Sequence, residues 1–245
     1  MRERLVRYTL LCSLIFLACE VSAAASQAEE PAKDAPKGEK KITMGMALDY
    51  NSRYIYRGYA YSEGPVLQPS VSLTINEFTF SSFGNYVLGN EPQQGQINEV
   101  DIYLTWSRTW EKITIEPSLN LYTSPNVPDS NSTFETSLSL SRDFGNFRVS
   151  TSHSADFVDG SSATYYGDLG LSHTLEVRPG LSLKTCAAFA WPEPLIALDA
   201  ALTYYLTKNV YLYPHIGIST IFKNSLSDSL EECLTAYGIG TGVEF

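Results

Sequence analysis

The sequence ends with Tyr237-Gly-Ile-Gly-Thr-Gly-Val-Glu-Phe245, in which large or apolar residues alternate with small ones. Tyr237, Ile239, Val243 and Phe245 form a large or apolar row, completed by Thr241, and glycines and one glutamate stand between them. A period of two residues predicts a β-strand with two different faces. An aromatic residue at the end of such a strand suits the interface between membrane and water. The stretch therefore predicts the last strand of a membrane β-barrel, with an amphipathic strand of a soluble sheet as the alternative.

The same ending resembles the C-terminal signal of bacterial outer-membrane proteins, in which the assembly machinery reads the final strand. The resemblance implies an assembly signal made by Tyr237, Ile239, Val243 and Phe245, and it implies the outer-membrane assembly machinery as a partner. If the strand count is even, this strand also closes the barrel by pairing with the strand that begins near Ile42, which leaves no open edge.

Composition narrows the class of protein. The mean hydropathy of -0.11 is too low for a bundle of membrane helices but ordinary for a barrel whose lipid face alone is apolar. Tyr is heavily used, with 16 residues, and charged residues are only 18%, which favours strands over helices. The net charge of -10 argues against a nucleic-acid partner, because phosphate recognition needs a basic surface.

The N-terminal residues predict export. Arg2, Arg4 and Arg7 precede an apolar run over residues 10–18, and small residues follow, so residues 1–25 are predicted to be a cleaved signal peptide. Cys19 lacks a Leu-like residue three positions earlier, where Phe16 stands, which argues against a lipoprotein. Residues 26–41 are charged, contain proline and lack periodicity, so we expect a flexible segment; a plug in the barrel lumen is the alternative.

Residues 42–245 are predicted to form one outer-membrane barrel. The period of two recurs along them and predicts an all-β, antiparallel, up-and-down transmembrane β-barrel of about 12 strands. Short connections near residues 76–77, 108–112, 142–146, 178–180 and 207–209 alternate with longer ones near 57–65, 89–97, 123–132, 155–163 and 222–231. Such alternation is typical of short periplasmic turns and longer outer loops, and residues 192–194 are the exception, a short connection where a long loop is expected.

Aromatic residues near the predicted strand ends favour a membrane barrel over a soluble sandwich, where they would simply be core residues. We expect two aromatic girdles from Tyr50, Tyr54, Phe78, Phe80, Trp106, Trp110, Tyr165, Trp191, Tyr204 and Phe245. After removal of the signal peptide only Cys186 and Cys233 remain, in strands predicted to lie three apart, so we expect them to be unpaired.

Several short motifs resemble the TorF-type porin family, also called the Gcw family. The segment Leu48-Asp-Tyr-Asn-Ser-Arg-Tyr-Ile-Tyr-Arg-Gly58 resembles the opening of these proteins, with Tyr56, Arg57 and Gly58 as its Tyr/Phe-Arg-Gly motif. Glu99 and Asp101 look like the family's Glu-hydrophobic-Asp element. The resemblance spans residues 42–245 and implies a porin-type barrel in the outer membrane of a Gram-negative bacterium, without naming a solute.

The polar face of the predicted strands gives the expected pore-lining residues. They are Asp49, Arg53, Asp101, Tyr103, Glu116, Tyr122, Glu135, Arg148, Asp168, Lys184, Asp199, Tyr211, Tyr213 and His215. Acidic groups outnumber basic ones, so a water-filled lumen would prefer cations, whereas full pairing of Arg53, Arg148 and Lys184 with carboxylates would close it. We expect a narrow, weakly cation-preferring pore for small solutes or ions. A closed structural or surface-interaction barrel is the alternative.

An enzyme is the rival from another class, because some 12-stranded outer-membrane barrels are lipases. His153, between Ser152 and Ser154, is the best candidate for a base, but Ser152 is expected to face the lumen and His153 the lipid. No carboxylate or amide partner stands out, so we expect no enzyme. No phosphate-binding glycine loop and no metal spacing is present in the sequence, so no cofactor and no metal are expected.

Overall fold

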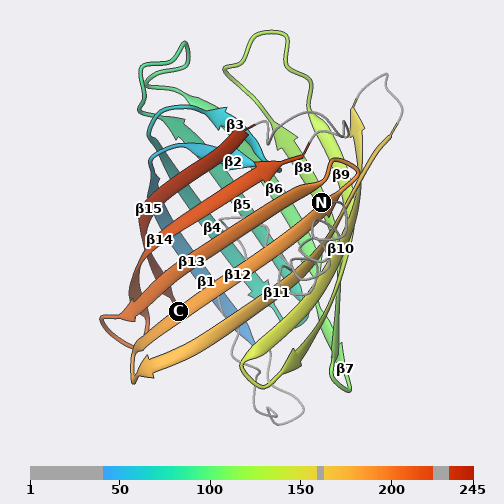
Figure 1. The fold of residues 1–245 in the computed structure, drawn as a ribbon, viewed down its shortest axis with the longest axis vertical. Helices are drawn as coiled ribbons and strands as arrows, with labels where there is room; N and C mark the ends of the chain where they lie inside the picture. The colour runs from blue at the N-terminus through green and yellow to red at the C-terminus, as the bar shows by residue number, and fades with distance from the viewer. Residues whose placement is uncertain (1–40, 159–162, 223–231) are drawn as a thin grey trace, which may run out of the picture.

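A computed structural model describes residues 41–158, 163–222 and 232–245 of the chain. The predicted signal peptide and residues 26–40 lie outside the described residues. Twelve long antiparallel strands form a closed barrel (Figure 1). They are β1 (Ile42–Asn51), β4 (Val66–Ile75), β5 (Phe78–Val87), β6 (Ile97–Trp106), β8 (Ile113–Thr123), β9 (Thr133–Phe144), β10 (Phe147–Val158), β11 (Thr164–Arg178), β12 (Leu181–Trp191), β13 (Leu195–Tyr205), β14 (Val210–Ile221) and β15 (Glu232–Glu244). Three short strands accompany them: β2 (Tyr54–Tyr56), β3 (Tyr59–Ser62) and β7 (Arg108–Trp110).

The final strand closes the barrel, as its sequence predicts. β15 pairs with β14 on one side and with β1 on the other, and Tyr50 lies opposite Ile239 in the β1–β15 register. The backbones of Met44 and Phe245 exchange two hydrogen bonds, with N–O distances of 3.2 and 2.9 Å. Every long strand therefore has two neighbours, and the sheet has no open edge.

The two rims of the barrel differ in the length of their connections (Figure 1). The short-turn rim carries residues 76–77, 145–146, 179–180 and 206–209, together with the small β7 extension, and both Ile42 and Phe245 lie there. The long-loop rim carries residues 52–65, 88–96 and 124–132 and the short connection 192–194. The predicted alternation and its one exception are present in these connections. The loops predicted near 155–163 and 222–231 lie partly outside the described residues, and β10 continues the wall as far as Val158.

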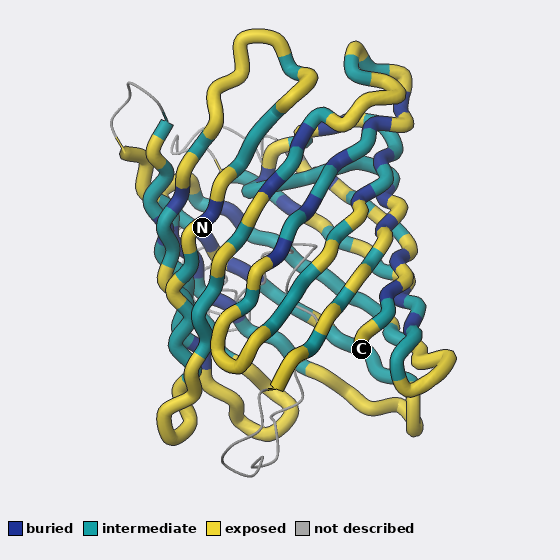
Figure 2. Tube along the Cα trace, turned by 180° about the vertical axis from the view of Figure 1, so that it is seen from behind, coloured by how far each residue is buried: buried dark blue, intermediate teal, exposed yellow. Residues whose placement is uncertain are grey.

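The apolar surface of the barrel lies outside. On β1 the alternate residues Ile42, Met44, Met46, Leu48 and Tyr50 are exposed, whereas the residues between them turn inward, and the two nearest the long-loop rim, Asp49 and Asn51, are buried. Figure 2 shows this alternation along strand after strand. A continuous belt of exposed apolar side chains would be costly in water and is the expected surface of a barrel in lipid.

One predicted girdle residue lies elsewhere. Tyr54 is on β2, where its ring packs 5.6 Å from Tyr61 and 5.9 Å from Phe83, so it belongs to the lumen and not to an outer girdle. Tyr50 and Tyr54 are an even number of residues apart, so a continuous strand would place both on the outer face. The chain leaves β1 after Asn51, however, so Tyr54 does not follow that alternation.

Two further observations concern the rest of the described chain. Cys186 and Cys233, on β12 and β15, are not joined by a disulfide. Within residues 41–158, 163–222 and 232–245, no helix is long and apolar enough to cross a membrane.

Candidate functional site

The candidate site is the barrel lumen, where the structure places the inward residues that the sequence indicated at different depths. Six are almost inaccessible: Asp49, Asp101, Glu135, Asp168, Tyr211 and Tyr213. Seven are half-buried: Arg53, Tyr103, Glu116, Tyr122, Lys184, Asp199 and His215. Arg148 is exposed near the short-turn rim, where its Nε donates to Asp143 Oδ1 at 2.7 Å.

A small hairpin narrows the lumen. β2 and β3 form a two-stranded sheet of their own, separate from the barrel wall, and Arg57 and Gly58 form the turn between them. Both turn residues have positive φ, 49° and 81°, as a two-residue type I′ turn requires. A Cβ on Gly58 would lie 2.7 Å from Ile221 and 2.8 Å from Leu195, so this position needs glycine for space as well as conformation.

Arg57, at the tip of this hairpin, is bound to the opposite side of the barrel. Its Nη1 donates to Asp156 Oδ2 at 2.7 Å, and its Nη2 donates to Ser154 Oγ at 3.0 Å and to the Glu135 carboxylate. The guanidinium carbon lies 4.2 Å from the centre of the Tyr166 ring, a cation–π contact. We call this inward face of β8–β11 the acidic wall; its residues are Asn120, Tyr122, Glu135, Ser154, Asp156, Tyr166 and Asp168.

A second acidic group lies beside the hairpin. Asp101 and Glu99 project inward from β6, and the Tyr103 hydroxyl donates to Asp101 Oδ2 at 2.8 Å. Tyrosine rings continue from there to the hairpin, because the Tyr122 ring lies 6.0 Å from Tyr103 and 6.2 Å from Tyr56. Carboxyl groups and tyrosine rings therefore surround the hairpin on this side.

The opposite side of the lumen is built from aromatic rings lying over glycines. We call the inward face of β14, β15 and β1 the seam wall; its residues are Asp49, Asn51, Tyr211, Tyr213, His215, Gly238, Gly240 and Gly242. Any Cβ on Gly240 would overlap Tyr213 and Asp49, and one on Gly242 would overlap Tyr211. The Tyr213 ring stacks on His215 with centroids 5.6 Å apart. The terminal glycines of the sequence thus make room for neighbouring lumen side chains.

A row of polar side chains runs around the barrel toward the long-loop rim. His215 Nε2 lies 2.7 Å from Asn51 Oδ1, across Gly238 on the intervening strand. Asn51 Nδ2 then donates to Gln68 Oε1, Gln68 Nε2 to Asn85 Oδ1 and Asn85 Nδ2 to Asn98 Oδ1, at 2.7–2.9 Å. We call these four carboxamides, on β1, β4, β5 and β6, the amide row.

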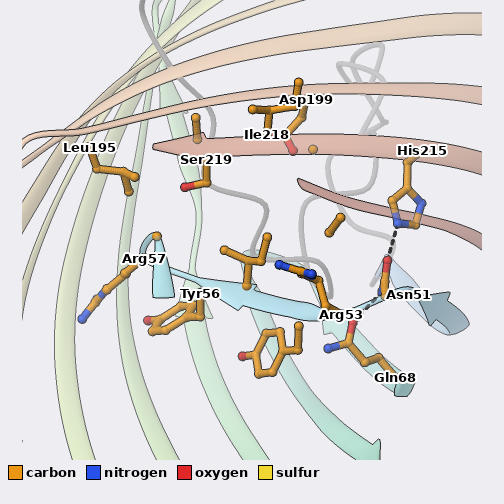
Figure 3. A pocket seen from close by; sticks show the side chains of 16 residues that line it. Asn51, Arg53, Tyr56, Arg57, Gln68, Leu195, Asp199, His215, Ile218 and Ser219 are labelled. Carbon is orange, nitrogen blue, oxygen red and sulfur yellow. Dashed lines mark hydrogen bonds between the residues drawn. The ribbon is translucent and has the colours of Figure 1, made fainter. Parts of the chain in front are cut away.

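A cavity of about 110 Å³ separates the hairpin from the seam wall and β13. Figure 3 shows Arg53, Asn51 and His215 gathered on one side of it, and Asp199 on the other, while the Arg57 side chain points away from the cavity. Arg53 Nη1 lies 3.6 Å from the Glu63 carboxylate. The described part of the chain contains no group of three or more His, Cys, Asp and Glu residues able to hold a metal ion.

His153, the candidate base, lies outside the lumen. Its ring contacts the Tyr165 hydroxyl through Nδ1 and lies 3.3 Å from Thr151 Oγ1 through Nε2, with Trp191 edge-on at 5.7 Å. The Thr151 hydroxyl donates to the backbone carbonyl of Asp168 at 2.7 Å. Because that proton is already donated to the backbone, the hydroxyl is not presented to the imidazole as a nucleophile would be.

Several lumen residues are not among those that the sequence predicts. The sequence predicts a loop at Asp156, although Ser152, Ser154 and Asp156 share one parity along β10. Tyr56, Arg57 and Gly58 resemble a family motif, but their sequence does not indicate a place in the lumen. No local pattern shows that this segment folds into the barrel.

The comparisons with known proteins agree on the architecture. No protein-family model and no curated protein matches the chain. Among solved structures, the chain is similar to the KdgM porin, with 13% identity over 82% of this chain and 99% of that one, at a TM-score of 0.57. That porin is also known in complex with disordered oligogalacturonate.

Two other similar structures have different activities. An outer membrane channel from Pseudomonas putida F1 has 10% identity over 89% of this chain and 100% of its own, at a TM-score of 0.52. Outer membrane phospholipase A from Escherichia coli has 15% identity over 89% and 94%, at 0.51. At such identities the likeness establishes the fold of an outer-membrane barrel, which channels and an enzyme share.

Proposed function

We propose that this protein is an outer-membrane porin through which small cations pass passively. The carboxyl groups on the inward face carry this proposal: Asp49, Asp101, Glu135 and Asp168 are each at most 6% exposed. A buried carboxyl group that keeps its charge needs a cation or ordered water close by. Rings of acidic side chains are also how cation channels exclude anions.

The same charge argues against an acidic oligosaccharide as the solute. The KdgM porin binds oligogalacturonate, a polyanion. In the lumen described above the carboxylates outnumber Arg53, Arg57, Arg148 and Lys184, and Arg57 already has two carboxyl partners. A polyanion entering this lumen would meet like charge, whereas a small cation would meet its counterions.

The hairpin makes the proposed pore narrow. It projects between Leu195 of β13 and Ile221 of β14, which lie close to Gly58, and the acidic wall, where Arg57 is bound. Any path through the lumen must therefore run around the hairpin, past side chains of both sides. This favours ions and small solutes over bulky ones.

Three finer proposals follow from the sequence together with the fold. We assign the barrel to the TorF-type family, supported by the position of Tyr56, Arg57 and Gly58 at the constriction. We propose that Phe245 and the outward row of β15 are read by the assembly machinery, supported by their exposure, 69% for Phe245 and 62% for Tyr237. We propose that residues 1–25 serve as the export signal.

We infer that the barrel is not a lipase. The His153 cluster has the outward position that lipid chemistry would need, but the Thr151 proton is donated to the backbone. A phospholipase assay on the purified barrel is expected to show no activity above that of the His153→Ala variant. Hydrolysis that depends on His153 would establish the enzyme instead.

Planar-bilayer recordings test the porin proposal. Purified barrel is expected to give small, stable conductance steps, and a salt gradient is expected to give a reversal potential on the cation side. Clear anion preference contradicts the proposed selectivity. A barrel that inserts but conducts no current is the closed structural or surface-interaction barrel.

A further inference from the structure

The contacts of Arg57 describe a binding site as well as a constriction. Three neighbouring strands supply the groups around the guanidinium: Glu135 from β9, Ser154 and Asp156 from β10, and Tyr166 from β11. The exposed fractions of the side chains are 15% for Arg57, 4% for Glu135 and 18% for Asp156. The charged groups are thus largely withdrawn from water.

The barrel wall, not the hairpin, fixes the geometry of this site. Glu135 lies directly opposite Asp156 in the β9–β10 register, and Ser154 lies opposite Tyr166 in the β10–β11 register. Glu135 Oε1 accepts hydrogen bonds from Asn120 at 2.6 Å and from the Tyr122 hydroxyl at 2.9 Å, which leaves Oε2 for the guanidinium. The receptor is therefore held by rigid strands and by hydrogen bonds that do not involve Arg57.

This arrangement calls for a cation with the shape of guanidinium. Two carboxyl groups facing one another across a strand pair repel when both are charged, and a cation between them relieves the repulsion. A planar fork of N–H donors can bond to two carboxylates and a hydroxyl in one plane while its face lies on an aromatic ring. A compact ammonium group offers neither the fork nor the flat face.

Arg57, which occupies the site in this structure, and the hairpin that carries it are attached to the barrel wall through side chains. β2 and β3 hydrogen-bond to each other and not to the barrel strands, so no backbone ladder holds the tip of the hairpin against the acidic wall. Tyr59 provides another side-chain link, from its hydroxyl to the Glu193 carboxylate. Arg57 can therefore leave the site without breaking the barrel sheet.

We propose that the acidic wall is a guanidinium-binding site that Arg57 occupies from within the chain, and that guanidinium-class organic cations entering the lumen compete with Arg57 for it. The inference deepens the proposed function, on which it rests for the access of the solute to the lumen. It names the class of cation that the narrow part of the pore recognises: a planar, forked cation in preference to an ammonium.

Calorimetric titration of the full-length barrel in detergent tests the proposal without measuring any current. Methylguanidinium is the probe, and methylammonium is the matched control ion. Arg57→Ala removes the internal competitor, so methylguanidinium is expected to bind this variant at least about tenfold more tightly than the wild type, as follows if Arg57 fills the site nine-tenths of the time. Methylammonium is expected to bind all variants equally weakly.

Three further variants make the result decisive. Arg108→Ala removes an exposed arginine that is 3.7 Å from Glu77, and it is expected to bind the probe as the wild type does. Adding Glu135→Gln to Arg57→Ala is expected to abolish the gain. Arg57→Lys retains a positive charge at the tip and serves if Arg57→Ala does not fold; it too is expected to bind methylguanidinium more tightly than the wild type.

Two results would overturn the site. One is an affinity for methylguanidinium that does not rise in a folded Arg57 variant, and the other is an equal rise for methylammonium. The outcome is separate from that of the pore proposal. A barrel that binds methylguanidinium but never conducts supports the binding site and contradicts the porin. A barrel that conducts but does not bind methylguanidinium supports the porin and contradicts the binding site.

Discussion

The seam wall and the acidic wall, on opposite sides of the lumen, have the same antiparallel strand geometry but are stabilised in different ways. On the seam wall, rings of Tyr213 and His215 lie over glycines, and His215 pairs with Asn51 of the same wall. On the acidic wall, Glu135 and Asp156 face one another and are bridged by a residue from outside the wall, Arg57. The seam wall is held by close packing of its side chains, whereas the acidic wall needs a cation between Glu135 and Asp156. The same antiparallel strand geometry thus holds one wall together by packing within it and the other by a cation from the hairpin.

Deleting Phe245 removes the residue that follows β15, the middle strand of the seam wall. Of the variants considered, it is expected to have the largest effect, which is on assembly. The variant loses two backbone hydrogen bonds to Met44 and the outward ring that we assign to the assembly signal. We expect most of the protein to fail to reach the membrane, with unchanged conductance for the few barrels that insert. Counting inserted barrels by protease protection of whole cells measures this. Normal insertion would contradict the assignment.

Arg57→Ala attacks the acidic wall and is expected to cost about 3–5 kcal/mol of folding free energy, because it leaves two buried carboxyl groups opposed without their cation. Urea unfolding in lipid vesicles, followed by tryptophan fluorescence, gives the value. The exposed control Arg108→Ala is expected to cost less than about 1 kcal/mol. Adding Glu135→Gln to Arg57→Ala is expected to recover part of the loss, and no recovery would show that opposed charge is not the cause.

Gly238→Ala and Gly242→Ala compare two positions of the seam wall. A Cβ at Gly238 meets the Tyr50 backbone carbonyl and the hydrogen-bonded pair of Asn51 and His215, so we expect a loss of about 1–3 kcal/mol. The atoms nearest to a Cβ at Gly242 belong to the far end of the Tyr211 ring, and the end of a side chain shifts more easily than backbone, so we expect a loss of less than about 1 kcal/mol. Equal losses in the same unfolding assay would refute the steric argument.

The smallest expected effect concerns ion preference. Asp168→Asn removes one charge from the acidic wall and is expected to lower the cation-to-anion permeability ratio by up to about fivefold, since a unit charge near an ion in water contributes about 1 kcal/mol. Tyr213→Phe, on the seam wall, removes no charge and is expected to leave the ratio unchanged. Reversal potentials in a salt gradient measure both. A larger shift for Tyr213→Phe would place selectivity on the seam wall.

Most of the fold was predictable because the alternation of apolar and polar residues is a local pattern that recurs in nearly every strand. Alternation such as Ile42, Met44 and Met46 against Thr43 and Gly45 reports which face meets lipid, and the terminal residues Tyr237 to Phe245 identify the closing strand. The prediction for Tyr54 was wrong where the chain leaves the wall. Period-two reasoning assumes that one strand continues, and after Asn51 it does not.

The inward residues were predictable one at a time, but their grouping was not. The parity of Glu135 and Asp101 follows from the pattern, whereas the bond between Arg57 and Asp156 joins residues separated by 99 positions. That contact depends on closure of the barrel and on the inward fold of the hairpin, which no short window of sequence encodes. Arg57 at positive φ is the sharpest example, because a local preference would place Asn or Gly there.

The amide row has a mechanical consequence. Its bonds run along the circumference of the barrel, from His215 over Gly238 to Asn51 and on to Asn98, so they act as a partial hoop near the long-loop rim. A solute that pushed the walls apart would stretch these hydrogen bonds, and the strain on one bond would be transmitted through its carboxamide to the next. The long-loop rim is thus the reinforced one, and its stiffness is set by side chains as well as by the sheet.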